Sequence, residues 1–252
     1  MTNYNTQKKI TLGYELDSWN DFSQKKQIDI DITSSANSHI LICGMSGSGK
    51  SYFQTQIFAR LIKAEKDGEF YFADYKLEDA FEQFRNTSRY FAFNDTLTAL
   101  DTVYNRLNAR LSNKDTTRNT VTLIWDEYIA NILALISEDK KKAQVVMNKV
   151  SEILLMGRSK SIRLIISCQR ADAIAFPVGS RLNYGVIVIL GAFNRSVYEM
   201  LMTDYIDKIK SKEFGRGEGT ILLQGSHLHF IKVPKIDNMN EIQEICRQAL
   251  VE

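Results

Sequence analysis

The segment Gly44-Met45-Ser46-Gly47-Ser48-Gly49-Lys50-Ser51 decides the fold that we expect for this chain of 252 residues. A mainly apolar run from His39 to Cys43 precedes it, and apolar residues at helical spacing follow it. Glycines let a chain turn sharply from a buried strand into a helix, so that backbone N–H groups and the positive helix end face one point. The pattern is typical of a phosphate-binding P-loop. A glycine-rich turn without a ligand is the alternative, but both flanks favour the P-loop, which predicts binding of a nucleoside triphosphate.

Two side chains of this segment have expected roles toward ATP and Mg²⁺, the two cofactors that the P-loop predicts. The ammonium group of Lys50 is expected to reach the β- and γ-phosphates, and the hydroxyl of Ser51 is expected to ligate Mg²⁺. The backbone from Gly44 to Ser51 is expected to surround the phosphates.

The composition is that of a chain with enough apolar residues for a sizeable core, since 44% of the residues are hydrophobic. The net charge is +2, so a surface for nucleic acid must be local. The cysteines Cys43, Cys168 and Cys246 are far apart and are expected to be reduced core thiols. The polar residues Met1 to Lys9 do not resemble a signal peptide, and no apolar run is long enough to cross a membrane. We therefore expect a cytoplasmic protein with no transmembrane segment.

Strands and helices alternate along the chain, which predicts an α/β fold with a mostly parallel central sheet flanked by helices. Strands are expected at residues 27–32, 40–43, 69–73, 120–125, 162–168, 186–190 and 220–223, and an antiparallel edge strand at 229–233. Helical spacing predicts helices after the P-loop, at 100–111, between 128 and 157 with a break near 137–142, and from 239. Only two prolines and no linker interrupt the chain. We expect one domain over residues 1–252, with an edge hairpin in 1–38 that leads into the core at 39–252.

A second motif ends the β-rich run from Thr120 to Trp125, which Asp126 and Glu127 follow. A carboxylate at the carboxyl end of a buried strand beside a P-loop can hold Mg²⁺, and the adjacent carboxylate can polarise an attacking water. Many strands exit into acidic turns, but together with the P-loop this pair is typical of a Walker B motif. Gln169 ends the next apolar run and is expected to sense the γ-phosphate or to hold the water. A plain polar strand end is the alternative for Gln169.

Several further segments resemble the FtsK/SpoIIIE branch of the HerA-like P-loop ATPases along nearly the whole chain. They are Ala73-Asp74-Tyr75-Lys76, where that family has an Asp-Pro-Lys turn, Ile124-Trp125-Asp126-Glu127-Tyr128, Gly157-Arg158-Ser159-Lys160-Ser161-Ile162 before Cys168-Gln169-Arg170, and Gly215-Arg216-Gly217-Glu218-Gly219. The block around Arg158 is far more specific than the P-loop, which hundreds of unrelated families share. Two features depart from the family's pattern, namely Tyr75 in place of the proline and a longer segment between Asp126 and Arg158.

The resemblance implies a RecA-like motor core that assembles as a ring, usually a hexamer, and translocates double-stranded DNA. It also implies that ATP lies between neighbouring subunits and that Arg158 acts as an arginine finger on a neighbour's ATP. A solvated arginine at a helix end is the alternative for Arg158. The chain is similar to compact motors of plasmids and other mobile elements, which serve DNA transfer, segregation or replication. A relaxase or a replication initiator is therefore among the expected partners.

Two other functions stay open from the sequence. FtsK-like ATPases also power protein secretion, usually as tandem copies in a membrane-anchored chain. A nucleotide-gated adaptor that recruits a relaxase or replication protein is the second, although an adaptor does not need the full hydrolytic set. Lysines and arginines in loops, such as Lys114, Arg118 and Lys140 to Lys142, are candidates for contact with DNA phosphates. Solvated surface is the simpler interpretation of each.

Overall fold

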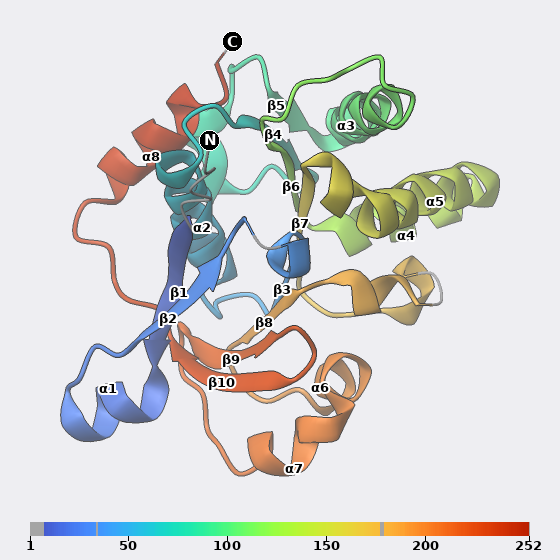
Figure 1. Cartoon of the computed structure of the whole chain (residues 1–252). Helices are drawn as coiled ribbons and strands as arrows, with labels where there is room; N and C mark the ends of the chain where they lie inside the picture. Colours follow the sequence, from blue (N-terminus) through green and yellow to red (C-terminus); the bar gives the residue numbers. More distant parts are fainter. Residues whose placement is uncertain (1–7, 34, 177–178, 252) are drawn as a thin grey trace.

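One ten-stranded sheet runs through residues 8–33, 35–176 and 179–251, which are the residues that the computed structural model describes (Figure 1). Its strands lie in the order β2-β1-β10-β9-β8-β3-β7-β6-β4-β5. Their bounds are β1 Lys9–Glu15, β2 Gln27–Asp31, β3 Ile40–Gly44, β4 Glu69–Asp74, β5 Tyr90–Ala92, β6 Val121–Asp126, β7 Ile162–Cys168, β8 Val186–Leu190, β9 Glu218–Leu223 and β10 His227–Lys232. The prediction that residues 1–9 are not a signal peptide falls mostly on residues 1–7, which lie outside the described residues.

Six neighbouring strands, from β8 through β3, β7, β6 and β4 to β5, are parallel. The residues of β3, β6, β7 and β8 are buried on both faces, which explains why the sequence shows nearly continuous apolar runs there. Along β3, Ile40 and Ile42 enter one core, whereas Leu41 and Cys43 enter the other. The predicted α/β class with a mostly parallel sheet is confirmed.

Helices cover both faces of this sheet (Figure 1). The helix α2 (Lys50–Ala64) and the last helix α8 (Met239–Gln248) contribute to the core on one face. The helices α3 (Thr96–Leu111), α4 (Tyr128–Glu138) and α5 (Lys140–Met156) contribute to the core on the other face. The expected break between α4 and α5 is present at Asp139, whose side chain accepts hydrogen bonds from the backbone N–H groups of Lys141 and Lys142. In the described residues, no helix is long and apolar enough to span a membrane.

The other four strands are antiparallel and continue the sheet beyond β8. The expectation that the strand near residues 229–233 forms an edge is wrong, because β10 lies between β9 and β1. The hairpin of β1 and β2 covers β10, so β2 becomes the edge strand. A helix that the sequence did not indicate, α1 (Leu16–Phe22), joins the two hairpin strands, and the short helices α6 (Arg195–Leu201) and α7 (Ile206–Ile209) connect β8 to β9. Division of the chain into a lead-in and a core stays a prediction.

The order of the parallel strands determines which side chains meet at their carboxyl ends. The P-loop follows β3, the Asp126-Glu127 pair ends β6, and β7 lies between these two strands. Gln169 follows β7 directly. The candidate residues near the P-loop are therefore gathered by three adjacent strands at one end of the sheet.

Candidate functional site

The P-loop has a backbone conformation that requires glycine. Gly47 and Gly49 have φ angles of 80° and 97°, which lie in the left-handed region that side chains disfavour. Gly49 is the last residue before α2, and Lys50 is the first residue of that helix. The loop borders a cavity of about 350 Å³, which is lined among others by Ser46, Gly47, Lys50, Ser51, Glu78, Gln169 and Arg216. Free N–H groups at the start of a 15-residue helix therefore face a cavity large enough for a polyphosphate.

Lys50 and the two carboxylates of the second motif are in direct contact. The Lys50 Nζ atom lies 2.8 Å from Glu127 Oε1 and 3.3 Å from Asp126 Oδ1. All three side chains are buried, with exposed fractions of 5%, 3% and 0% for Lys50, Glu127 and Asp126. Glu127 adopts a left-handed backbone conformation with φ of 55°, which is uncommon for a residue other than glycine and is often found at functional sites.

Burial and charge act in opposite directions on these groups. Burial raises the pKa of Asp126 to about 6, although the positive charge of Lys50 opposes the rise. Burial alone would lower the pKa of Lys50, but the negative charges of Asp126 and Glu127 outweigh it, so the pKa of Lys50 lies above its ordinary value. Lys50 is therefore protonated at neutral pH and forms ion pairs with the two carboxylates.

Oxygen atoms near Lys50 fit a Mg²⁺ ion. The Oδ2 atom of Asp126 is buried and has no hydrogen-bond partner among the described residues. One ligand atom from each of Glu78, Asp126 and Glu127 lies within 4.8 Å of the other two. Ser51 and Glu78 both line the P-loop cavity. Carboxylate and hydroxyl oxygens are the ligands that Mg²⁺ prefers. Ser51 and Asp126 were expected as ligands, whereas Glu78 was not.

Gln169 lies where the sequence predicted, at the end of β7 and in the lining of the P-loop cavity. The residue before Cys168 also contributes, because the hydroxyl of Ser167 donates a hydrogen bond to Asp126 Oδ1. This contact fixes Oδ1 of Asp126 and leaves Oδ2 without a hydrogen-bond partner among the described residues. The sequence did not single out Ser167, since a serine in an apolar strand carries no chemical signal of its own.

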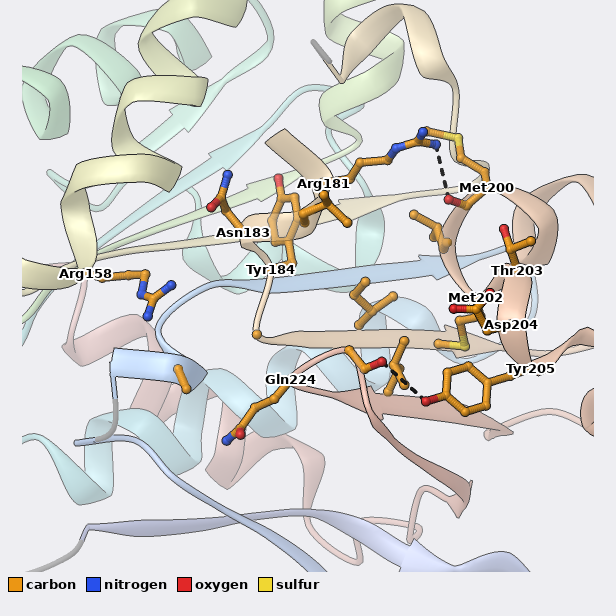
Figure 2. Close-up of a pocket in the computed structure, with 17 residues that line it drawn as sticks. Arg158, Arg181, Asn183, Tyr184, Met200, Met202, Thr203, Asp204, Tyr205 and Gln224 are labelled. Atoms are coloured by element: carbon orange, nitrogen blue, oxygen red, sulfur yellow. Dashed lines mark hydrogen bonds between the residues drawn. The ribbon is translucent and has the colours of Figure 1, made fainter. Parts of the chain in front are cut away.

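Arg158 does not join this group. It follows α5, in the turn before β7, and so lies at the amino end of the strand whose carboxyl end meets the P-loop. The seven residues of β7 separate the two ends by roughly 20 Å. Arg158 is exposed and lines a second cavity of about 560 Å³, together with Arg181, Tyr184 and Gln224 (Figure 2). Within one chain, Arg158 cannot reach a nucleotide at the P-loop.

Two cations near the P-loop were not among the predicted site residues. Lys76, in the turn after β4, forms an ion pair of 3.0 Å with Glu127 Oε2. Arg216 precedes β9 and lines the P-loop cavity. Both stand in segments that carried the family resemblance, Ala73-Asp74-Tyr75-Lys76 and Gly215-Arg216-Gly217, which was the only signal that could have identified them.

The Gly215-Arg216-Gly217 segment packs directly on the P-loop. The N–H group of Gly217 donates a hydrogen bond of 2.8 Å to the carbonyl of Ser48. A side chain at Gly49 would bring its Cβ atom within 3.3 Å of the Gly217 nitrogen. The antiparallel half of the sheet is thus joined to the phosphate-binding loop by backbone contacts.

The fold is that of RecA-like P-loop ATPases, and Lys50, Asp126 and Glu127 meet at the end of its parallel sheet. The family model of the HerA helicase central domain matches residues 21–70, which contain the P-loop. In sequence, the chain is similar to the FtsK domain-containing protein YdcQ of Bacillus subtilis (strain 168), with 28% identity over 225 residues. That match covers 81% of this chain and 45% of YdcQ, so the chain spans about half the length of this curated relative.

Two solved structures share the fold. The pCW3 conjugation coupling protein TcpA, solved with ATPγS, matches with a TM-score of 0.73 and 18% identity, over 96% of this chain and 71% of TcpA. The Type VII secretion ATPase EccC of Thermomonospora curvata matches with a TM-score of 0.70 and 16% identity, over 100% of this chain and 32% of EccC. The predicted resemblance to FtsK/HerA-like ATPases is confirmed.

Proposed function

We propose that this chain is an ATP-hydrolysing motor that translocates double-stranded DNA as part of a homo-oligomeric ring. One observation carries the proposal: Lys50, Asp126 and Glu127 meet at one end of the parallel sheet, whereas Arg158 lies at the other end. An ATPase that uses all four residues must place one copy's Arg158 against another copy's P-loop. The similarity to a conjugation coupling protein supports DNA as the substrate.

Each site residue has a role in this proposal. The P-loop N–H groups and Lys50 bind the phosphates of ATP, and Ser51 and Asp126 hold a Mg²⁺ ion, which would neutralise charge on the phosphate oxygens. Glu127 polarises the attacking water, and Gln169 holds that water or the γ-phosphate. Ser167 keeps Asp126 in its rotamer through the hydrogen bond described above.

Arg158 completes the site of a neighbouring subunit. An arginine that reaches the γ-phosphate from outside stabilises the charge that develops during phosphoryl transfer and accelerates the reaction by about 10³-fold or more. We propose a hexamer as the working assembly. The process served is the transfer, segregation or replication of a mobile element, with a relaxase or replication initiator as the recruiting partner.

The ATPase rate with and without duplex DNA tests the proposal. Duplex DNA should raise the rate, and salt should suppress the increase, because each phosphate contact adds roughly a 0.9-power dependence on salt. Unrelated duplexes of equal length should raise the ATPase rate equally, because the proposed contacts are with phosphates and not with bases. The Lys50→Ala variant is the control for contaminating ATPases. Indifference to DNA, or dependence on one short sequence, contradicts the translocase.

Protein secretion is the second candidate, because the fold is also that of the secretion ATPase EccC. For a secretion ATPase, a client polypeptide rather than DNA should raise the rate in the same assay. Negligible turnover under every condition, with ATP bound, would instead favour the nucleotide-gated adaptor. The three outcomes are distinct, so one set of rate measurements separates the three functions.

A further inference from the structure

Glu127 is held by two lysines that come from different elements. Its Oε1 atom lies 2.8 Å from the Nζ atom of Lys50, at the start of α2, and its Oε2 atom lies 3.0 Å from the Nζ atom of Lys76, after β4. The Glu127 side chain is 3% exposed, so it has little contact with water. Both oxygens of a buried carboxylate are therefore compensated by ammonium groups.

The two lysines differ in what a polyphosphate would do to them. Lys50 belongs to the P-loop, whose N–H groups surround the cavity, so phosphates at the loop attract its ammonium group away from the carboxylates. Lys76 contacts the other carboxylate oxygen of Glu127, is 37% exposed, and is not among the residues that line the cavity. When Lys50 turns to the phosphates, Lys76 is the remaining cation of the pair.

The turn that carries Lys76 is fixed by its own contacts. Asp74 is the register neighbour of Asp126 in the parallel strands β4 and β6. Its carboxylate accepts hydrogen bonds from the Tyr90 hydroxyl at 2.8 Å and from the Glu78 N–H group at 3.3 Å. These bonds hold the residues on both sides of Lys76. The lysine can therefore keep its place beside Glu127 without help from Lys50.

We propose that Lys76 is the counter-charge that keeps Glu127 paired while Lys50 transfers to the phosphates of bound ATP, and that it thereby sets the affinity for ATP. Lys76 acts through Glu127 and is a positioning residue. This inference rests on the proposed function, since it takes ATP as the ligand. The physical reason is that a buried carboxylate left without a partner is strongly unfavourable. Without Lys76, that penalty would oppose every binding event that removes Lys50 from Glu127.

The alternative for Lys76 is direct contact with the nucleotide, and a double-mutant cycle separates the two. If Lys76 acts through the charge of Glu127, then Lys76→Met should weaken ATP binding in the parent and have almost no effect when Glu127 is already Gln. If Lys76 touches the phosphates, the loss should be the same in both backgrounds.

The experiment is calorimetric titration with the non-hydrolysable analogue AMP-PNP in a chelator, so that no metal ion contributes charge. Lys76→Met should weaken binding by at least about tenfold, Lys76→Arg should bind like the parent, and Glu127→Gln should bind at least as tightly. Lys149→Met is the matched control, because Lys149 forms an ion pair of 2.7 Å with the exposed Asp101. Lys76→Gln, which also removes the charge, serves if Lys76→Met does not fold.

Three results decide the inference. Loss of affinity that disappears in the Glu127→Gln background supports it. Unchanged affinity of Lys76→Met, or an equal loss in both backgrounds, overturns it. If the parent protein itself does not bind AMP-PNP, the result contradicts the proposed function, on which the role of Lys76 rests.

Discussion

At the scale of single residues, substitutions of Lys50 and Glu127 are expected to affect ATP binding and hydrolysis differently. Lys50→Ala should abolish hydrolysis and weaken ATP binding, because the phosphates lose their cation and the buried Asp126 loses its ion pair. Glu127→Gln should keep binding intact and slow hydrolysis by ~10²-fold or more, which is within the range for a positioned base. Binding and turnover are measured separately for each variant.

A lysine on the same helix provides the control for this comparison. Lys63 is exposed near the end of α2, so Lys63→Ala should bind and hydrolyse ATP like the parent. Hydrolysis by Glu127→Gln at the parent rate would show that another group polarises the water. Normal ATP binding by Lys50→Ala would contradict the P-loop assignment.

How far the site could be predicted depends on whether a residue belongs to a contiguous motif. Lys50, Asp126 and Gln169 stand in local patterns, and the fold brings them to one end of the sheet as expected. Lys76 and Glu78 reach the same place through a turn after β4, and their contacts depend on side-chain packing across strands. No period or spacing along the chain encodes such contacts.

At the scale of elements, long helices and buried strands were predictable and short or strained ones were not. Periodicity needs several residues, so α3 and β7 were indicated, whereas the three residues of β5 and the four of α7 were too short to show any pattern. The place of β10 inside the sheet was missed because pairing partners are set by tertiary contacts. Strand β1, which pairs with β10, lies far away in sequence.

His39, just before β3, makes the amino end of the sheet sensitive to acid. It is fully buried, and its Nδ1 atom accepts a hydrogen bond of 3.1 Å from the Leu164 N–H group of β7. Burial, with smaller effects from the charges of Arg163 and Arg158, lowers the pKa of His39 to about 3. The unfolded chain takes up a proton near pH 6.5, whereas the folded protein does so only near pH 3. The contribution of neutral His39 to the free energy of unfolding is therefore fully present above about pH 6.5. It is lost progressively as the pH falls from 6.5 toward 3.

Denaturant unfolding at two pH values measures this effect. Between pH 7 and pH 5, the parent should lose about 2 kcal/mol more than His39→Gln, which keeps a neutral acceptor for the Leu164 N–H group. His227→Gln is the control, because His227 is exposed at the start of β10. Equal losses for the parent and His39→Gln would mean that His39 does not stay neutral in the folded state.

At the scale of the whole molecule, Arg158 and Lys50 are expected to complement each other between copies. Arg158→Ala should bind ATP normally and hydrolyse it very slowly, and Lys50→Ala should be nearly inactive alone. A mixture contains interfaces that pair an intact P-loop with an intact Arg158, so some activity should return. Fluorescence transfer between labelled chains checks that the two variants exchange subunits.

A mixture that exchanges and stays inactive at every ratio would contradict action in trans or would require an unbroken ring. A tandem dimer in one chain, with one substitution in each half, tests action in trans without relying on subunit exchange. The half that carries the intact P-loop lies beside the half that carries the intact Arg158, so a trans site should restore hydrolysis there.

The separation of Arg158 from the P-loop along β7 gives the proposed contact a direction. A head-to-tail contact of this kind joins two different surfaces of the chain. A pair of copies therefore still has one free surface of each kind, to which further copies can bind. An open row of copies always leaves one P-loop without its arginine, a lone copy has no complete site, and a closed circle has a complete site in every copy. Turnover per chain should therefore climb with protein concentration and level off once circles close. A turnover per chain that is independent of dilution would mean that each copy works alone.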